Sequence, residues 1–382
     1  MSKKLTFRNR TGGIDALYDR VVRRDRKVAP FKKGGTEVSI RENGRHLLPG
    51  IFARFTGRAF TGLAMTLLLS GLWLLGCSEE FEPFNGVDKL RVLSLQAEPP
   101  ALAEGGISVI TPLVYTADDA PLTYKWSWCP IAASSSEGGG CVVDEETVKD
   151  IIASFAEDQL GDDAAALLES FPFSFDLGDG PTTQFIYAIP AELLSNLCTQ
   201  LISQEIPSFI GVPQCDTFFN VVIRLEVTQG ETTLQAVKKI PLYIDRGRAT
   251  NNNPYIDGVG VTADSGKTAT APLIRGKWYD LTADISEAVI DSYTPFPTEE
   301  EPNPVAEKEL LFMTWYVTGG ETDAMRTSYI DGEVPFKALK RNRWKIPSEH
   351  DFPGDIISLF LVLQDEQGGA GWLVRDFEIK EE

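Results

Sequence analysis

Histidine is the scarcest residue of this chain, which has only His46 and His350 among its 382 residues. Relays of the Ser-His-Asp and Cys-His types need a histidine as general base, and many zinc or iron sites need several as ligands. His350 lies between Glu349 and Asp351 in a polar stretch, which is typical of a solvated side chain. The composition therefore excludes multi-histidine metal sites and argues against a histidine-dependent hydrolase.

Other motifs that carry chemistry are missing too. There is no GxGxxG after a strand-like run and no GxxxxGK[ST], so dinucleotide and P-loop chemistry lack support. The cysteines form no CxxC or CxxH pair, which argues against zinc. Carboxylates are abundant but lack EF-hand spacing, and the best calcium candidate is the turn Asp176–Gly180. Asp and Gly are equally common in turns without a metal, so no cofactor is expected.

A charge-free apolar run occupies residues 59–76 and stops at Cys77. Flanking arginines, an apolar region and a small final residue are typical of a secretory signal. Leu74-Leu75-Gly76-Cys77 resembles a bacterial lipobox, which implies cleavage before Cys77, lipidation of that cysteine and a short tether over 77–87. At about 18 residues the run also reaches the lower limit of a membrane-spanning helix, so an uncleaved anchor is the alternative. Both interpretations place residues 78–382 outside the cytoplasm.

The segment before this run is strongly basic, whereas the rest of the chain is acidic. Residues 1–58 hold 15 Lys and Arg against 5 Asp and Glu without periodicity, which predicts a disordered leader or a start codon assigned too far upstream. The leader carries +10 and the whole chain −19, which leaves −29 for the remainder. Nucleic acid is therefore not an expected partner, and the acidity is expected to serve solubility, with weak divalent-cation binding as the alternative.

The four remaining cysteines fall into two local pairs, Cys129 with Cys141 and Cys198 with Cys215. In an oxidising compartment such spacings predict disulfides. Each would close a loop of roughly 13 to 18 residues and stabilise the fold by about 3 kcal/mol. Four cysteines allow three connectivities, among which the sequence does not choose.

Period-two patterns predict a β-sandwich over residues 88–245. Its opening strand places Leu93, Leu95 and Ala97 on one face, and its second strand, 107–115, contains Pro112, which indicates an edge position. The third strand aligns three aromatic residues on one face, and we interpret them as core rather than as a ligand-stacking strip: Tyr124, Trp126 and Trp128.

Between these strands and the next, the period changes to that of helices. Residues 130–218 are predicted to form a largely helical insertion with one extended segment at 184–189. Its first helix carries an apolar stripe at Val148, Ile151, Ile152 and Phe155, and a later helix begins at Pro190. An insertion of this length is a natural place for specificity.

A polar linker at 246–254 separates a second unit, residues 255–382, that repeats the order of the first. Trp315 again lies in the predicted third strand, and the run Leu359–Leu363 of the final hairpin echoes Val221–Leu225. We therefore predict a mainly β protein of two tandem immunoglobulin-like sandwiches, the first with a helical insertion.

The stretch Leu90–Pro100 after the lipobox resembles uncharacterised surface lipoproteins of myxobacteria and their relatives. This resemblance implies tethered immunoglobulin-like modules without catalytic residues. The last hairpin is similar to the closing strands of polycystic-kidney-disease-type repeats. Phe175–Gly180 is similar to their Trp-Asp-Phe-Gly-Asp-Gly stretch, with Phe for Trp and Leu for Phe.

Together these features predict a non-enzymatic envelope lipoprotein that binds an envelope protein or a glycan or serves a structural role. Ser78 after the lipidated cysteine resembles the outer-membrane class, so we expect a lipid-anchored outer-membrane protein facing the periplasm or the exterior. The alternative is a carboxylate-based carbohydrate hydrolase with its site in the insertion, which requires two acidic side chains roughly 5 to 10 Å apart across a cleft.

Overall fold

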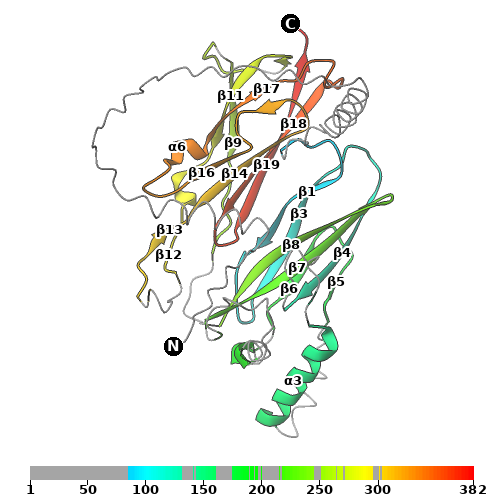
Figure 1. Cartoon of the computed structure of the whole chain (residues 1–382), viewed down its shortest axis with the longest axis vertical. Helices are drawn as coiled ribbons and strands as arrows, with labels where there is room; N and C mark the ends of the chain where they lie inside the picture. The colour runs from blue at the N-terminus through cyan, green and yellow to red at the C-terminus, as the bar shows by residue number, and fades with distance from the viewer. Residues whose placement is uncertain are drawn as a thin grey trace, which may run out of the picture. The chain divides into compact units, whose positions relative to one another are not determined.

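Residues 85–382 fold mainly into β-sheets whose strands follow the alternating apolar positions of the sequence (Figure 1). The computed structural model describes these residues except 131–140, 142, 161–173, 189, 193, 197–198, 200–214, 216, 245–250, 264, 270–271, 296–300 and 302. The predicted leader 1–58, the signal segment 59–76 and Cys77 lie outside the described residues. Phe84–Glu382 form a single unit, within which two pairs of sheets can be distinguished.

The first pair of sheets is built from the chain up to Tyr243. A three-stranded sheet has the order β1-β3-β6, and a five-stranded sheet has the order β2-β8-β7-β4-β5. Its elements, coloured blue to green in Figure 1, are β1 (Arg91–Glu98), β2 (Leu102–Ala103), β3 (Ile107–Tyr115), β4 (Leu122–Cys129), α3 (Glu145–Leu160), β5 (Asp176–Gly178), β6 (Thr183–Ile186), β7 (Phe218–Gln229) and β8 (Thr232–Tyr243).

The second pair follows the same plan. A four-stranded sheet has the order β15-β17-β11-β9, and a five-stranded sheet has the order β10-β19-β18-β14-β16. The elements are β9 (Gly258–Ala263), β10 (Leu273–Ile274), β11 (Trp278–Asp284), η4 (Glu287–Val289), β12 (Ser292–Tyr293), β13 (Glu307–Lys308), β14 (Leu311–Val317), β15 (Glu321–Thr322), β16 (Arg326–Tyr329), α6 (Phe336–Leu339), β17 (Arg341–Lys345), β18 (Ile356–Asp365) and β19 (Ala370–Lys380).

Strand order corresponds between the two pairs. In both, a two-residue strand runs parallel to the last strand, β2 beside β8 and β10 beside β19. In both, the last two strands form an antiparallel hairpin and the strand before them in the sheet carries buried tryptophan. Trp126 and Trp128 in β4 and Trp315 in β14 belong to the two cores, so the prediction of core tryptophans is confirmed.

The segment 130–218 differs from the predicted helical insertion. Helix α3 forms in it, but β5 pairs with β4 and β6 pairs with β3, so its middle supplies one strand to each sheet. The helical parts are therefore two separate connections, one between β4 and β5 and one between β6 and β7. The extended segment was visible in the sequence, but two strands of three and four residues are too short for a pattern to assign their partners.

Two details of the first sheet also correct the sequence interpretation. Strand β3 is central rather than an edge strand, yet β6 covers only Ile107–Ile110, so Pro112 has a neighbour on one side alone. A bulge at Leu93 shifts the β1 register between Val92 and Ser94. Because a bulge reverses the facing of the residues beyond it, Leu93 leaves the core that contains Leu95 and Ala97.

Core packing predicts a large loss of stability on truncating Trp126, which is fully buried and donates its indole N–H to the Gly180 carbonyl at 2.7 Å. Trp126→Ala is expected to lower the free energy of unfolding by about 3 to 5 kcal/mol, measured by urea denaturation, because it leaves a cavity and an unpaired carbonyl. Val237→Ala on β8, where the side chain is 55% exposed, is the control and should change it by less than about 0.5 kcal/mol. Equal losses would contradict this packing.

Candidate functional site

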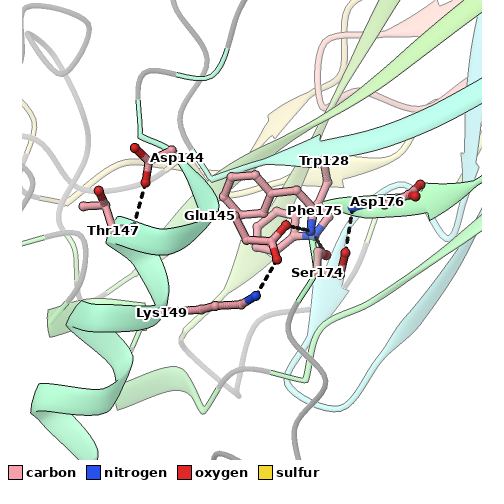
Figure 2. Close-up of polar contacts among 8 residues, drawn as sticks. All are labelled: Trp128, Asp144, Glu145, Thr147, Lys149, Ser174, Phe175 and Asp176. Carbon is pink, nitrogen blue, oxygen red and sulfur yellow. Dashed lines mark hydrogen bonds and ion pairs between the residues drawn. The ribbon is translucent and has the colours of Figure 1, made fainter.

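Helix α3 is fixed to the rim of the five-stranded sheet at its N-terminus. The Asp144 carboxylate accepts from the Thr147 N–H at 2.7 Å and so caps the first turn. Glu145 accepts from the Phe175 N–H at 2.9 Å and pairs with Lys149 at 2.6 Å, as Figure 2 shows. The Phe175 ring packs edge-on against Trp128 at 5.1 Å. The bond from Phe175 to Glu145 and the contact of the Phe175 ring with Trp128 thus attach the start of the helix to strand β4.

The carboxylates of Asp144 and Glu145, at the start of α3, are held in their charged form. The Thr147 amide lowers the pKa of Asp144, and Lys149 with the Phe175 amide lowers the pKa of Glu145. A glycosidase acid needs a raised pKa so that it keeps a proton near neutral pH. These two side chains therefore act as helix-capping and helix-anchoring groups, and the predicted pair of hydrolytic carboxylates is not formed by them.

The other residues singled out from the sequence lie nearby. Cys129 and Cys141 form a disulfide that joins the end of β4 to the segment before α3. Cys215 is also disulfide-bonded, while Cys198 lies outside the described residues. The turn Asp176–Gly180 is closed by its own groups, since Asp176 accepts from the Gly178 N–H at 2.9 Å. Within the described residues no group of three or more His, Cys, Asp or Glu is arranged to hold a metal.

An apolar cluster joins the two pairs of sheets. It contains Leu93 of β1, Tyr316 of β14 and Phe360 and Val362 of β18, together with Val87. The Phe360 ring meets Tyr115 of β3 edge-on at 5.7 Å. The bulge in β1 turns the Leu93 side chain into this cluster, and the outer face of β18 supplies Phe360 and Val362 opposite it. We call this cluster the junction.

The chain enters the fold through the junction. The Val87 N–H donates to the Val317 carbonyl at 2.9 Å, and the Val317 N–H donates to the Asn85 carbonyl at 3.0 Å. These bonds form a parallel bridge at the end of β14 that β16 leaves open, because β16 pairs only with Leu311–Thr314. Val87 is 2% exposed. The predicted tether 77–87 is therefore wrong at its end, where residues 85–87 are part of the folded body.

Two asparagines of the predicted linker 246–254 continue the junction as polar contacts. The Asn253 side chain donates to the Ala97 carbonyl at 2.7 Å and accepts from the Ala370 N–H at 2.8 Å, so it bonds to both pairs of sheets. The Asn251 amide donates to Asp365 at 3.0 Å. The described part of this linker is thus held to the folded body by specific side-chain hydrogen bonds.

Buried ionisable groups surround the turn between β18 and β19. Lys238 of β8 donates to the Gly368 carbonyl, and burial lowers its pKa to about 8 against the opposing effect of Asp365. Burial raises the pKa of Asp365 itself. Glu309 is 2% exposed, and burial followed by the charges of Asp365, Asp291 and Glu366 raises its pKa to about 8. These three side chains form a polar cluster beside the junction, in which Lys238 of the first pair of sheets bonds to the turn of the second.

A polar hollow of about 480 Å³ lies on the outer face of the four-stranded sheet. Six outward side chains supply its polar wall: Thr262, Asp280, Thr282, Asp323, Arg341 and Arg343. The Arg343 guanidinium is 3.4 Å from the Asp280 carboxylate and lies over the Trp278 ring at 5.0 Å. Buried Asn342 fixes the rim, since its side chain accepts from the Ala324 N–H at 3.1 Å and donates to the Ala324 carbonyl at 2.7 Å.

Neither the hollow nor the junction was predicted from the sequence. The hollow is lined by β9, β11, β17 and residues 323–324, and no strand was predicted at β17. A signal for the junction was present, because Leu359–Leu363 is apolar at five successive positions. Such a run indicates a strand buried on both faces rather than one.

Comparison with known proteins gives no family. No protein-family model and no curated protein matches the chain. It is similar to the solved structure of a 1.5-MDa bacterial ice-binding adhesin, with 10% identity, a TM-score of 0.17 and coverage of 78% of this chain and 67% of the other. For the Yersinia pseudotuberculosis adhesin InvE the values are 12%, 0.17, 76% and 60%, and for native E. coli α2-macroglobulin 8%, 0.18, 78% and 17%. TM-scores this low support no statement about function.

Helices long and apolar enough to cross a membrane do not occur among the residues that the structure describes.

The raised pKa of Glu309 predicts a pH-dependent stability. The folded protein keeps this proton up to pH about 8, whereas the ordinary pKa is 4.5, so stability is fully present below pH 4.5 and falls as the pH rises to about 8. Glu309→Gln keeps the acceptor for the Asp291 N–H but removes the titration. Urea unfolding at pH 5 and pH 8 should show that the wild type loses on the order of 2 to 4 kcal/mol more than the variant. Glu349→Gln, at an exposed position, should behave as wild type, and equal losses in all three proteins would contradict the assignment.

Proposed function

We propose that this chain is an exported, lipid-anchored envelope protein whose two immunoglobulin-like sandwiches form a non-catalytic module for binding or for envelope structure. The lipobox-like Leu74-Leu75-Gly76-Cys77 supports the anchor, and the disulfide Cys129–Cys141 supports an oxidising compartment. The corresponding strand orders of the two sheet pairs support the immunoglobulin-like assignment.

The observation that carries the proposal is the junction. Contacts between domains of one chain usually permit relative motion unless the interface is large and apolar. Here apolar side chains of β1, β3, β14 and β18 pack together, and Asn253 bonds to both bodies. A fixed pair of sandwiches suits a module that presents a surface at a set orientation. The helical connections and the polar hollow are the surfaces such a module offers.

Anchoring is tested by labelling cells with palmitate. The wild-type chain is expected to incorporate label and to sediment with membranes. Cys77→Ala is expected to remove the label, while Ser78→Ala, which leaves the thiol in place, should retain it. Label that persists in Cys77→Ala, or wild-type protein recovered unlabelled from the cytosol, would overturn the proposal.

Rigidity of the junction is tested by limited proteolysis with trypsin, which can cleave at Arg246 and Arg248 in the linker. Phe360→Ala removes a ring at the centre of the junction and should increase the cleavage rate there severalfold, since truncating a buried aromatic side chain costs about 3 to 5 kcal/mol. Val237→Ala, at a residue that is 55% exposed on β8, should leave the rate unchanged. Equal rates in all three proteins would mean that the cluster does not hold the two bodies together.

A further inference from the structure

We propose that the polar hollow on strands β9, β11 and β17 binds a short acidic oligosaccharide, with Arg341 receiving the carboxylate of the sugar. This inference rests on the proposed function and names the ligand class of the module. It assigns to the second pair of sheets a recognition role that the sequence placed in the segment 130–218.

The register of the sheet sets out the hollow in two rows. In one row Thr262 faces Asp280, and Asp280 faces Arg343. In the other, Gly260 faces Thr282, and Thr282 faces Arg341. Alternate residues lie about 7 Å apart along a strand and neighbouring strands about 5 Å apart, so the rows form a shallow polar grid on the solvent face.

The two rows differ in charge. Arg343 is paired with Asp280 at 3.4 Å and is held over Trp278, so its charge is already balanced. Arg341 faces a hydroxyl and, beyond it, a glycine, and it forms no ion pair with any described residue. An exposed guanidinium whose cross-strand neighbours are neutral is suited to bidentate recognition of a carboxylate.

Gly260, across Thr282 from Arg341, adds no side chain to this row. A Cβ built there would meet nothing nearer than the Thr282 carbonyl oxygen at 3.7 Å. The row of Arg341 is therefore open above Thr282. The position can also accept a side chain without a backbone clash, which makes it a site for a blocking substitution.

The remaining groups favour a sugar over the other acidic ligands. The hollow offers side-chain hydroxyls and carboxylates that can hydrogen-bond to the hydroxyls of a sugar ring, from Thr262, Thr282, Asp280 and Asp323. Peptides that bind sheets usually pair with an exposed edge, whereas the hollow lies across β11, which has neighbours on both sides. Nucleic acid needs several clustered cations for its successive phosphates, whereas the hollow offers one arginine without an ion pair to any described residue, Arg341, which matches a single carboxylate.

The test is a calorimetric titration of the purified full-length chain with a tetramer of glucuronic acid, and in parallel with the neutral glucose tetramer and with tetraglutamate. We expect saturable binding of the glucuronic acid tetramer and at least tenfold weaker binding of the other two, because only the acidic sugar satisfies both Arg341 and the hydroxyl-binding row. Equal binding of the neutral sugar, tighter binding of tetraglutamate, or no saturable binding would overturn the proposal.

Four variants locate the site. Arg341→Gln and Gly260→Leu should each weaken binding by about tenfold or more, and Arg341→Lys should retain part of the affinity because it keeps the charge without the planar fork. Arg375→Gln, an exposed arginine on β19, is the matched control and should bind as wild type. An unchanged thermal transition in all variants shows that folding is intact. Equal weakening by Arg375→Gln would overturn the assignment to the hollow.

The two proposals fail in different ways. If the titrations fail while palmitate labelling still depends on Cys77, the ligand assignment falls and the anchored module stands. If labelling fails while binding at the hollow holds, the envelope location falls and the sugar site stands as a property of the folded chain.

Discussion

Burial of strand β18 on both faces is the constraint on which the arrangement of this protein depends. Leu359, Leu361 and Leu363 face the core between the second pair of sheets, whereas Phe360 and Val362 face the junction. Each such side chain contributes about 1.5 to 3 kcal/mol when removed from water. One five-residue run therefore stabilises both a domain core and the contact with its neighbour.

The polar half of the junction serves a different purpose. Asp365 and Glu309 are buried and Lys238 is partly buried, and ionisable groups in such settings are weak sources of net stability. Their geometry is directional, since Lys238 bonds to the turn at Gly368 and Asn253 bonds to strands of both bodies. The apolar cluster supplies most of the stability, and the polar groups specify the register in which the bodies meet.

Long strands of this fold could be predicted from the sequence, and short ones could not. The alternation in residues 107–115 and the hairpin of β7 and β8, which turns at Gly230 with φ +58°, were strong local patterns. Strands β5, β6 and β17 were missed as sheet members because they have three to five residues and acquire their place only through partners. The side of the sheet on which Leu93 lies depends on a β-bulge, which shifts the register of β1 against β3 and leaves no signal in the composition.

The same reasoning explains which parts of the candidate sites were accessible to prediction. The disulfide Cys129–Cys141 was one of the candidate pairs from local spacing, but the sequence left three connectivities open, and the fold selects this pair by placing the end of β4 beside Cys141. The polar hollow depends on the cross-strand register of β9, β11 and β17, which brings Thr262, Asp280 and Arg343 into one row. Residues separated by about 80 positions meet there, and only the paired sheet reveals that they do.

The bridge of Asn85 and Val87 to Val317 determines how tension would travel through the molecule. Any force applied to the chain before Asn85 reaches β14 of the second body before it reaches β1 of the first. Because the bridging segment runs parallel to β14 and Val87 is packed between the bodies, the load is divided between them at its point of entry. A chain drawn from this end would load this short bridge first, so residues 85–87 would detach from β14 before the two bodies separate.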